Sequence, residues 1–170
     1  STQLRRHLIL SQPLRRYTHA PDMVAELVAL GRMMRTWIDV RPERVAVVIS
    51  GDMSHTHRPD GPYAYSEMSV AFDAAVGRWA ADPCHQAHSL LEEARSLQPE
   101  ALSCGFTGMV LLHGMLCSGD GDDDDDSMND PNNNQGTGFD PPAVWDAHVW
   151  ANRNVTYYGM MVASYEHITN

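Results

Sequence analysis

A cluster of polar, titratable residues follows one apolar stretch of the chain. Val45–Ile49 holds five apolar residues, most of them β-branched, and a Ser-Gly pair ends the run. Asp52, His55 and His57 follow within a few positions. Histidine titrates nearest neutral pH, so His55 is a candidate for taking a proton from a substrate and later returning it. Because ligand crevices form at the carboxyl ends of parallel strands, we expect chemistry at this point of the chain.

The neighbours of His55 each allow two interpretations. Asp52 either orients His55 or closes the turn through its own side chain, and the turn is the more ordinary role. His57 points the same way as His55 if the segment stays extended, and away from it if the turn tightens. Ser54 lies in no G-x-S-x-G pattern, so the sequence does not favour a serine hydrolase.

Cysteine supplies a further candidate. Cys104 opens an apolar stretch with helical spacing, and a helix N-terminus would favour its thiolate; the alternative is a small buried residue. The chain has three cysteines, an odd number, and we expect reduced thiols in a reducing compartment, hence a cytoplasmic location. Cys84, His85 and His88 imitate metal-ligand spacing, but with no second cluster we interpret them as surface residues. His113 lies on an apolar stripe and is predicted to be a core histidine.

Periodicity predicts a succession of strands and helices. Strands are expected over 6–10, 45–49, 144–150 and 155–165, and helices over 21–38, 67–81, 85–97 and 104–117. A turn is expected at 151–154, and the apolar spacing in 155–165 would equally suit one face of a helix. The first strand, helix and strand favour parallel pairing, so the predicted class is α/β, with a central, mostly parallel or mixed sheet flanked by helices. So few strands make a thin sheet. We therefore expect the fold to be completed by a preceding segment or by a second copy in a homo-oligomer.

Composition limits the partners and the domain organisation. The 170 residues suit one domain, formed by 1–117 and 139–170, with the Asp- and Asn-rich stretch 118–138 as a disordered insertion. This stretch holds seven of the acidic residues, so the rest of the chain is only mildly acidic despite a net charge of −10. The absence of a basic stripe argues against nucleic acid as a partner, and no apolar run is long enough for a membrane span.

Three motifs carry a resemblance to a known family. They are SGDMSH (Ser50–His55), CGFTGMVLLHGML (Cys104–Leu116) and YYGMMVASY (Tyr157–Tyr165). Residues Pro13–Met115 resemble the class III extradiol ring-cleavage dioxygenases, typified by the catalytic subunit of protocatechuate 4,5-dioxygenase. They also share features with the Memo proteins, which are built on the same fold.

The resemblance implies an oxidoreductase that opens catechol-type rings with O2 on non-haem Fe(II), with His55 as the catalytic acid and base. Asp52 and His57 would support the pocket. The family's two iron-binding histidines match no position here, which implies that the N-terminal part of the fold is missing.

A glutamate ligand of the dioxygenases is replaced here by the pair Cys104-Gly105. Memo proteins carry a Cys-Gly pair at this place, with the cysteine near the metal. A Cys104 ligand would suit zinc or copper better than iron. The alternative is therefore a Memo-like, non-enzymatic metal-binding or interaction protein.

Overall fold

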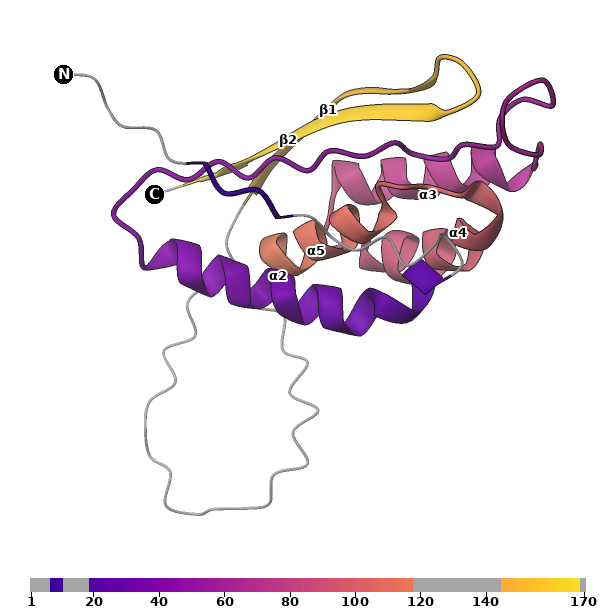
Figure 1. Cartoon of the computed structure of the whole chain (residues 1–170). Helices are drawn as coiled ribbons and strands as arrows, with labels where there is room; N and C mark the ends of the chain where they lie inside the picture. Colours follow the sequence, from indigo (N-terminus) through magenta and orange to yellow (C-terminus); the bar gives the residue numbers. More distant parts are fainter. Residues whose placement is uncertain (1–6, 11–18, 118–144, 169–170) are drawn as a thin grey trace.

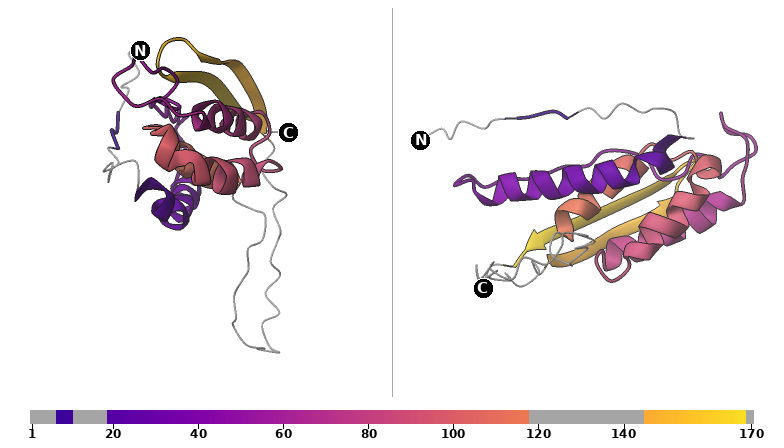
Figure 2. Two further views of the ribbon diagram at one scale, coloured as in Figure 1. Left: turned by 90° about the vertical axis from the view of Figure 1, so that its right-hand side faces the viewer. Right: turned by 90° about the horizontal axis from the view of Figure 1, so that it is seen from below.

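Three layers make up the part of the chain that the structure, a computed structural model, describes: residues 7–10, 19–117 and 145–168. Figure 1 shows helix α2 (Val24–Asp39) along one side and the hairpin of β1 (Trp145–Asn154) and β2 (Gly159–His167) along the other. The remaining helices lie between them. The left view of Figure 2 shows the same order, with the hairpin and α2 on opposite sides.

The first helix agrees with the prediction. A short 3-10 turn, η1 (Ala20–Met23), leads directly into α2, and Pro21 lies in this first turn, where its missing N–H is not needed. Val24 and Leu27 are buried on one face of α2. That face packs on α5 (Phe106–Leu116), which is apolar almost all round and buried.

The middle layer holds the core. Helix α3 (Met68–Ala81) is confirmed within a residue, and its Phe72 and Trp79 are fully buried. Phe72 lies beside Phe106 of α5, with ring centres 6.3 Å apart. Trp79 Nε1–H donates to His113 Nδ1 at 3.2 Å. His113 is therefore the hydrogen-bonded core histidine that the sequence predicts.

One helix end differs from the prediction. The stretch expected as a helix over 85–97 is a π-helical turn, η2 (Ser89–Ala94), followed by α4 (Arg95–Ala101). Pro99 lies inside α4 instead of ending it. Its missing N–H leaves one helical hydrogen bond unmade, and α4 ends two residues later, at Ala101. Leu102, in the left-handed conformation with φ 55°, ends the helix.

The hairpin is antiparallel. Trp145 pairs with His167 and Asn154 with Gly159, so the turn predicted at 151–154 is strand, and the chain turns at 155–158 instead. Tyr165 donates a hydrogen bond to the Ala80 carbonyl oxygen at 3.1 Å, and burial raises the pKa of its hydroxyl. The mixture of helices and strands is confirmed. The expected central parallel sheet is not, because the sheet of the described residues has two antiparallel strands.

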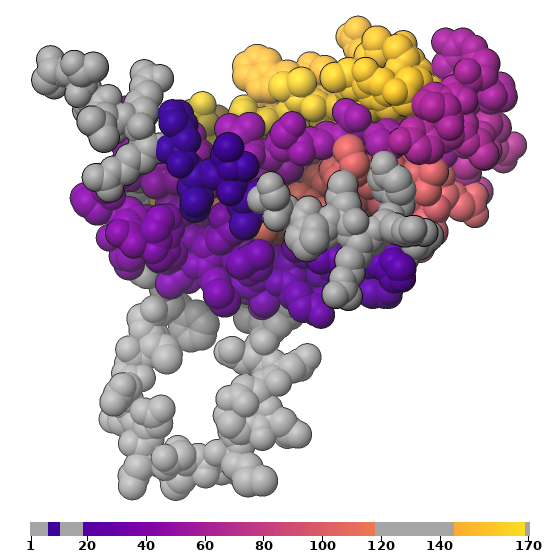
Figure 3. Space-filling view, viewed as in Figure 1, coloured from indigo at the N-terminus to yellow at the C-terminus, as the bar shows by residue number. Residues whose placement is uncertain are grey.

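The predicted strands at 45–49 and 6–10 are wrong within the described residues. Val45–Ile49 is extended but forms no backbone hydrogen bond with another described residue, and Val48 is 84% exposed. Leu8 and Ile9 are each 88% exposed. Figure 3 shows the segment around 45–49 at the surface beside the hairpin. A β-branched run favours a strand only when a neighbouring strand takes up its backbone groups. Completion of the sheet by a second copy or a preceding segment stays a prediction.

Two further expectations concern residues that are not described. The insertion predicted over 118–138 falls in the undescribed range 118–144, so its order and the domain boundaries stay predictions. Among the helices of the described part, none combines the length and apolar character needed to cross a membrane.

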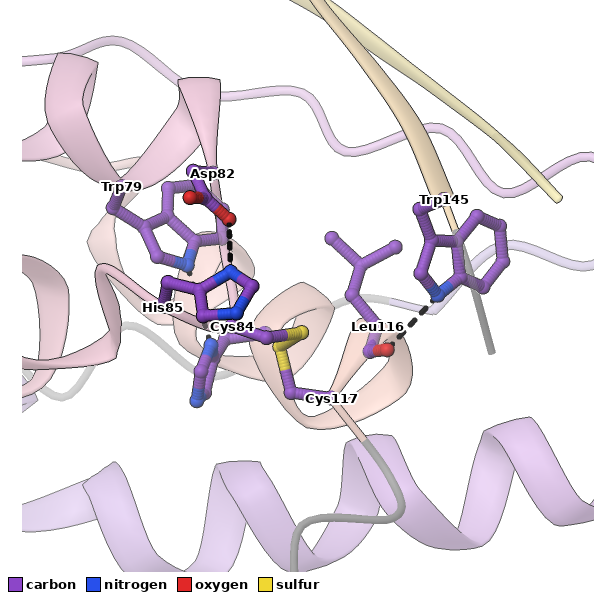
Figure 4. The surroundings of a disulfide bond; sticks show 8 residues. Trp79, Asp82, Cys84, His85, Leu116, Cys117 and Trp145 are labelled. Carbon is purple, nitrogen blue, oxygen red and sulfur yellow. Dashed lines mark hydrogen bonds and ion pairs between the residues drawn. A yellow bond between two sulfur atoms is a disulfide. The ribbon is translucent and has the colours of Figure 1, made fainter. Parts of the chain in front are cut away.

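A disulfide corrects the interpretation of the cysteines. Cys84 and Cys117 are bonded, with their Cα atoms 5.4 Å apart, and only Cys104 is free. Figure 4 shows the bond joining the segment after α3 to the end of α5, beside an Asp82–His85 pair. The expectation of three reduced thiols is therefore wrong. Since stable disulfides belong to oxidising compartments, the cysteines no longer support a cytoplasmic location.

We predict that replacing Cys84 and Cys117 together by serine lowers the free energy of unfolding by about 2–4 kcal/mol, because the bond closes a loop of 33 residues. Urea unfolding followed by tryptophan fluorescence measures the change. A reductant should destabilise the wild type similarly and leave the double variant unaffected. Three reactive thiols in the native, unreduced protein would contradict the prediction.

Candidate metal centre

Two glycines bring the centre together. A Cβ atom on Gly51 would lie 2.6 Å from the Gly105 Cα, and one on Gly105 would lie 2.8 Å from the Asp52 carbonyl oxygen. No side chain fits between backbones that approach this closely. The segment after 45–49 therefore touches the loop before α5, which carries Cys104.

Hydrogen bonds hold this contact in place. The Asp52 carbonyl oxygen accepts from Gly105 N–H at 2.9 Å and from Ser103 Oγ–H at 2.8 Å. The Asp52 N–H in turn donates to Cys104 Sγ at 3.1 Å. The sulfur is thus oriented by a backbone donor, and hydrogen bonds to sulfur ligands are one way in which proteins tune a metal site.

Three potential ligands meet at this contact. One ligand atom each from Asp52, His55 and Cys104 lies within 4.8 Å of the other two. His55 Nε2 is 3.3 Å from Asp52 Oδ2, longer than most hydrogen bonds between such groups. The structure thus groups a carboxylate, an imidazole and a thiol that the sequence leaves separate.

His55 is enclosed on several sides. It is only 6% exposed, and its backbone N–H donates to the Ala101 carbonyl oxygen at 2.7 Å. The imidazole stacks on Tyr63, with ring centres 5.1 Å apart, and Tyr158 presents an edge to it. The Asp52 side chain is 45% exposed, so the centre opens to solvent on the aspartate side.

His57 belongs to a second cluster. Its Nε2 lies 2.7 Å from Asp73 Oδ2 on α3 and 2.8 Å from Ser54 Oγ. The segment therefore turns tightly. Asp52 and His55 form one pair, beside Cys104, and Ser54 and His57 form a second pair, beside Asp73 of α3. His57 and Asp73 also line a shallow pocket of about 200 Å³, closed on one side by Asn152–Asn154 of β1. A role of His57 in substrate binding stays a prediction, but it lies with Asp73 and not with Asp52.

This second cluster is not a serine-hydrolase triad. In such a triad the histidine contacts serine through one ring nitrogen and aspartate through the other. Here the same nitrogen of His57 faces both partners, and Ser54 Oγ also lies 2.8 Å from Asp73 Oδ1. Ser54 is completely buried, so no substrate reaches it. The geometry agrees with the absence of a G-x-S-x-G pattern.

Side chains that follow His55 in the sequence lie in different surroundings. Tyr63 contacts His55, as described, whereas Tyr65 is 53% exposed. Arg58 pairs with Asp60 at the surface, and this hydrogen bond lowers the pKa of the Asp60 carboxyl below its usual value. The side chains of His85 and His88 are 86% and 63% exposed and pair with Asp82 and Glu93, which confirms the surface assignment of the two histidines.

Asp73 is the functional candidate that sequence reasoning missed. The predicted helix over 67–81 has an apolar stripe, and Asp73 lies one turn before Val76 on it. A carboxylate in such a position needs buried hydrogen-bond donors. A carboxylate on the apolar face of a predicted helix therefore indicates a buried polar contact, but the sequence does not show which residues supply the donors.

Comparison with known proteins adds no relative: no protein-family model matches the chain, and no curated protein matches it significantly. The functional assignment therefore depends on the geometry of the residues themselves.

We predict that Gly51→Ala lowers the free energy of unfolding by about 1–3 kcal/mol, because the added methyl group overpacks the contact with Gly105. Urea unfolding measures the effect. Ser50→Ala, at the exposed neighbouring position, is the matched control and should change stability by less than about 0.5 kcal/mol. Equal stability of the two variants would show that the close approach of the backbones is not needed.

Proposed function

We propose that this chain is a metal-binding protein whose centre holds zinc through Asp52, His55 and Cys104. The observation that carries the proposal is the grouping of these three ligand atoms within 4.8 Å. They come from two segments about fifty positions apart in the sequence. Nothing in the apolar packing alone requires a carboxylate, an imidazole and a thiol to meet there.

The separation of two of these atoms fits a tetrahedral ion. Nitrogen and oxygen ligands about 2.0–2.1 Å from one zinc ion are about 3.3–3.4 Å apart at the tetrahedral angle. His55 Nε2 and Asp52 Oδ2 are 3.3 Å apart.

The set of donor atoms selects the metal. A thiolate favours zinc or copper(I), while the carboxylate of Asp52 is a hard ligand that suits zinc better than copper(I). Iron(II) centres that activate oxygen commonly use two histidines and one carboxylate. The described residues offer one histidine with a thiol instead, so they do not fit an iron centre of that kind.

Three protein ligands are typical of zinc sites that keep a position open for water or a substrate. The half-exposed Asp52 side chain leaves an approach from solvent, while buried His55 closes the inner side. When bound, zinc would supply Lewis-acid polarisation of whatever oxygen atom enters from the open side.

A second candidate is the extradiol ring cleavage that the family resemblance implies, with a catechol-type substrate and O2. The observation that favours it is the aromatic wall of Tyr63 and Tyr158 around His55. In that function His55 takes a proton from a substrate hydroxyl and returns it later, with Asp52 orienting the ring. It assigns His55 to proton transfer, whereas the zinc proposal assigns it to the metal.

We predict that the full chain binds one zinc ion and that zinc protects a single thiol. Because Cys84 and Cys117 are bonded to each other, Cys104 is the one thiol that a disulfide reagent can titrate. Cys104→Ser and His55→Ala should each weaken zinc binding more than about 100-fold, beyond the usual cost of losing a hydrogen bond to a ligand. Competition with a chromophoric chelator measures the affinity.

His85→Ala, which removes an exposed histidine, is the control and should leave zinc affinity unchanged. Equal affinity of the Cys104→Ser variant and the wild type would refute the centre. Oxygen uptake with a panel of catechols, after loading with iron(II), separates the two candidates. The zinc proposal predicts no uptake, and uptake that is lost in His55→Ala would favour ring cleavage.

A further inference from the structure

We propose that Asp73 is a positioning residue for the metal centre. Its carboxylate holds Ser54 and His57, the two residues that alternate with Asp52 and His55 along the segment, and so sets where these ligands lie. The inference rests on the proposed zinc centre and extends it to a residue of helix α3 that does not touch the three ligands.

The contacts of Asp73 lead to this proposal. Its Oδ1 accepts from Ser54 N–H at 3.0 Å and from Ser54 Oγ–H at 2.8 Å, and its Oδ2 lies 2.7 Å from His57 Nε2. The Asp73 side chain is 11% exposed. A carboxylate so far removed from water is stable only with several donors, and here all three come from one short stretch of chain.

Strand β2 fixes the other side of this cluster. Met53 N–H donates to the Gly159 carbonyl oxygen at 3.1 Å, and Gly159 N–H donates to the Ser54 carbonyl oxygen at 2.8 Å. A Cβ atom on Gly159 would lie 2.0 Å from Asp73 Oδ2, so the carboxylate occupies the space that a side chain would need. The segment is therefore held between α3 and the start of β2.

This support matters because the segment has no regular secondary structure of its own. Residues 50–57 belong to no helix or strand, yet Met53 to Thr56 are buried. Functional groups must be held within about 0.5 Å of their working positions, and side-chain hydrogen bonds do this where a helix or sheet does not. Loss of a supporting hydrogen bond typically weakens metal binding 10- to 100-fold.

The test compares zinc affinity of the full chain and of Asp73→Asn. The amide NH2 of an asparagine would face either His57 Nε2–H or the Ser54 N–H. In both orientations two hydrogen-bond donors would face each other. We expect zinc affinity to fall about 10- to 100-fold, with one ion still bound at saturation. Cobalt(II) at saturation should give the same thiolate absorption band in both proteins, because the three ligands are unchanged.

Two controls separate positioning from general stability. Asp82→Asn changes an exposed aspartate that also pairs with a histidine, and should leave zinc affinity unchanged. Phe72→Leu removes packing from the same helix beside Asp73 but leaves the carboxylate intact, so it should lower stability to urea without changing zinc affinity.

The outcomes are distinct. If the wild type binds no zinc, the proposed function fails before Asp73 is tested. The positioning role is wrong if the wild type binds zinc and the zinc affinity of Asp73→Asn lies within about twofold of it. It is also wrong if Phe72→Leu weakens zinc binding as much as Asp73→Asn does. If Asp73→Asn does not fold, Ser54→Ala decides: a loss of about 2- to 10-fold supports the role, and unchanged affinity overturns it.

Discussion

The close approach of Gly51 and Gly105 is the constraint on which the rest of the centre depends. Two backbones meet without intervening side chains, and the backbone of Asp52 makes two hydrogen bonds across the contact. Its N–H donates to Cys104 Sγ, and its carbonyl oxygen accepts from Gly105 N–H. A bulkier residue at either glycine separates the segments. The carboxylate and imidazole would then lose the thiol, because Cys104 is carried by the other segment.

The segment that follows is held by groups from several elements. Thr56 Oγ1–H donates to the Glu100 carbonyl oxygen at 2.9 Å, and the Thr56 carbonyl oxygen accepts from Ser66 N–H at 3.0 Å. His57 N–H donates to the Tyr157 carbonyl oxygen at 3.1 Å. The end of α4, where the Ala101 carbonyl oxygen accepts from His55 N–H, the stretch before α3 and the turn before β2 thus take up backbone groups that a regular strand would have paired. This explains how an irregular segment can be buried while Val45–Val48, just before it, stay exposed.

Helix α5 connects the centre with the disulfide. Cys104 lies two residues before its first residue, and Cys117 directly follows its last. One end is therefore tied to the Asp52 segment, and the other is bonded to Cys84 after α3. Since the helix is buried along most of its length, neither end can move without disturbing the core. The sulfur ligand is placed by a rigid element even though it lies on a loop.

Local patterns in the sequence determined the helices well. Apolar spacing and Pro21 predicted α2, the stripe through Phe72 and Trp79 predicted α3, and His113 was correctly placed in the core, because these signals act over a few turns of one helix. His55 was the leading candidate for proton transfer, and the family resemblance made Cys104 a candidate metal ligand. What residue spacing could not show was the pairing of Cys84 with Cys117, since a disulfide depends on which segments lie side by side.

Tertiary structure alone decided the partners of each group. The β-branched run at 45–49 predicted a buried strand, but a strand forms only where another supplies hydrogen bonds, and the described residues place none there. The turn that sends His55 toward Cys104 and His57 toward Asp73 was one of two alternatives that the sequence left open. Its outcome depends on two glycines in contact and on a carboxylate from α3. These are long-range contacts, so the residue types were visible in the sequence while their meeting required the fold.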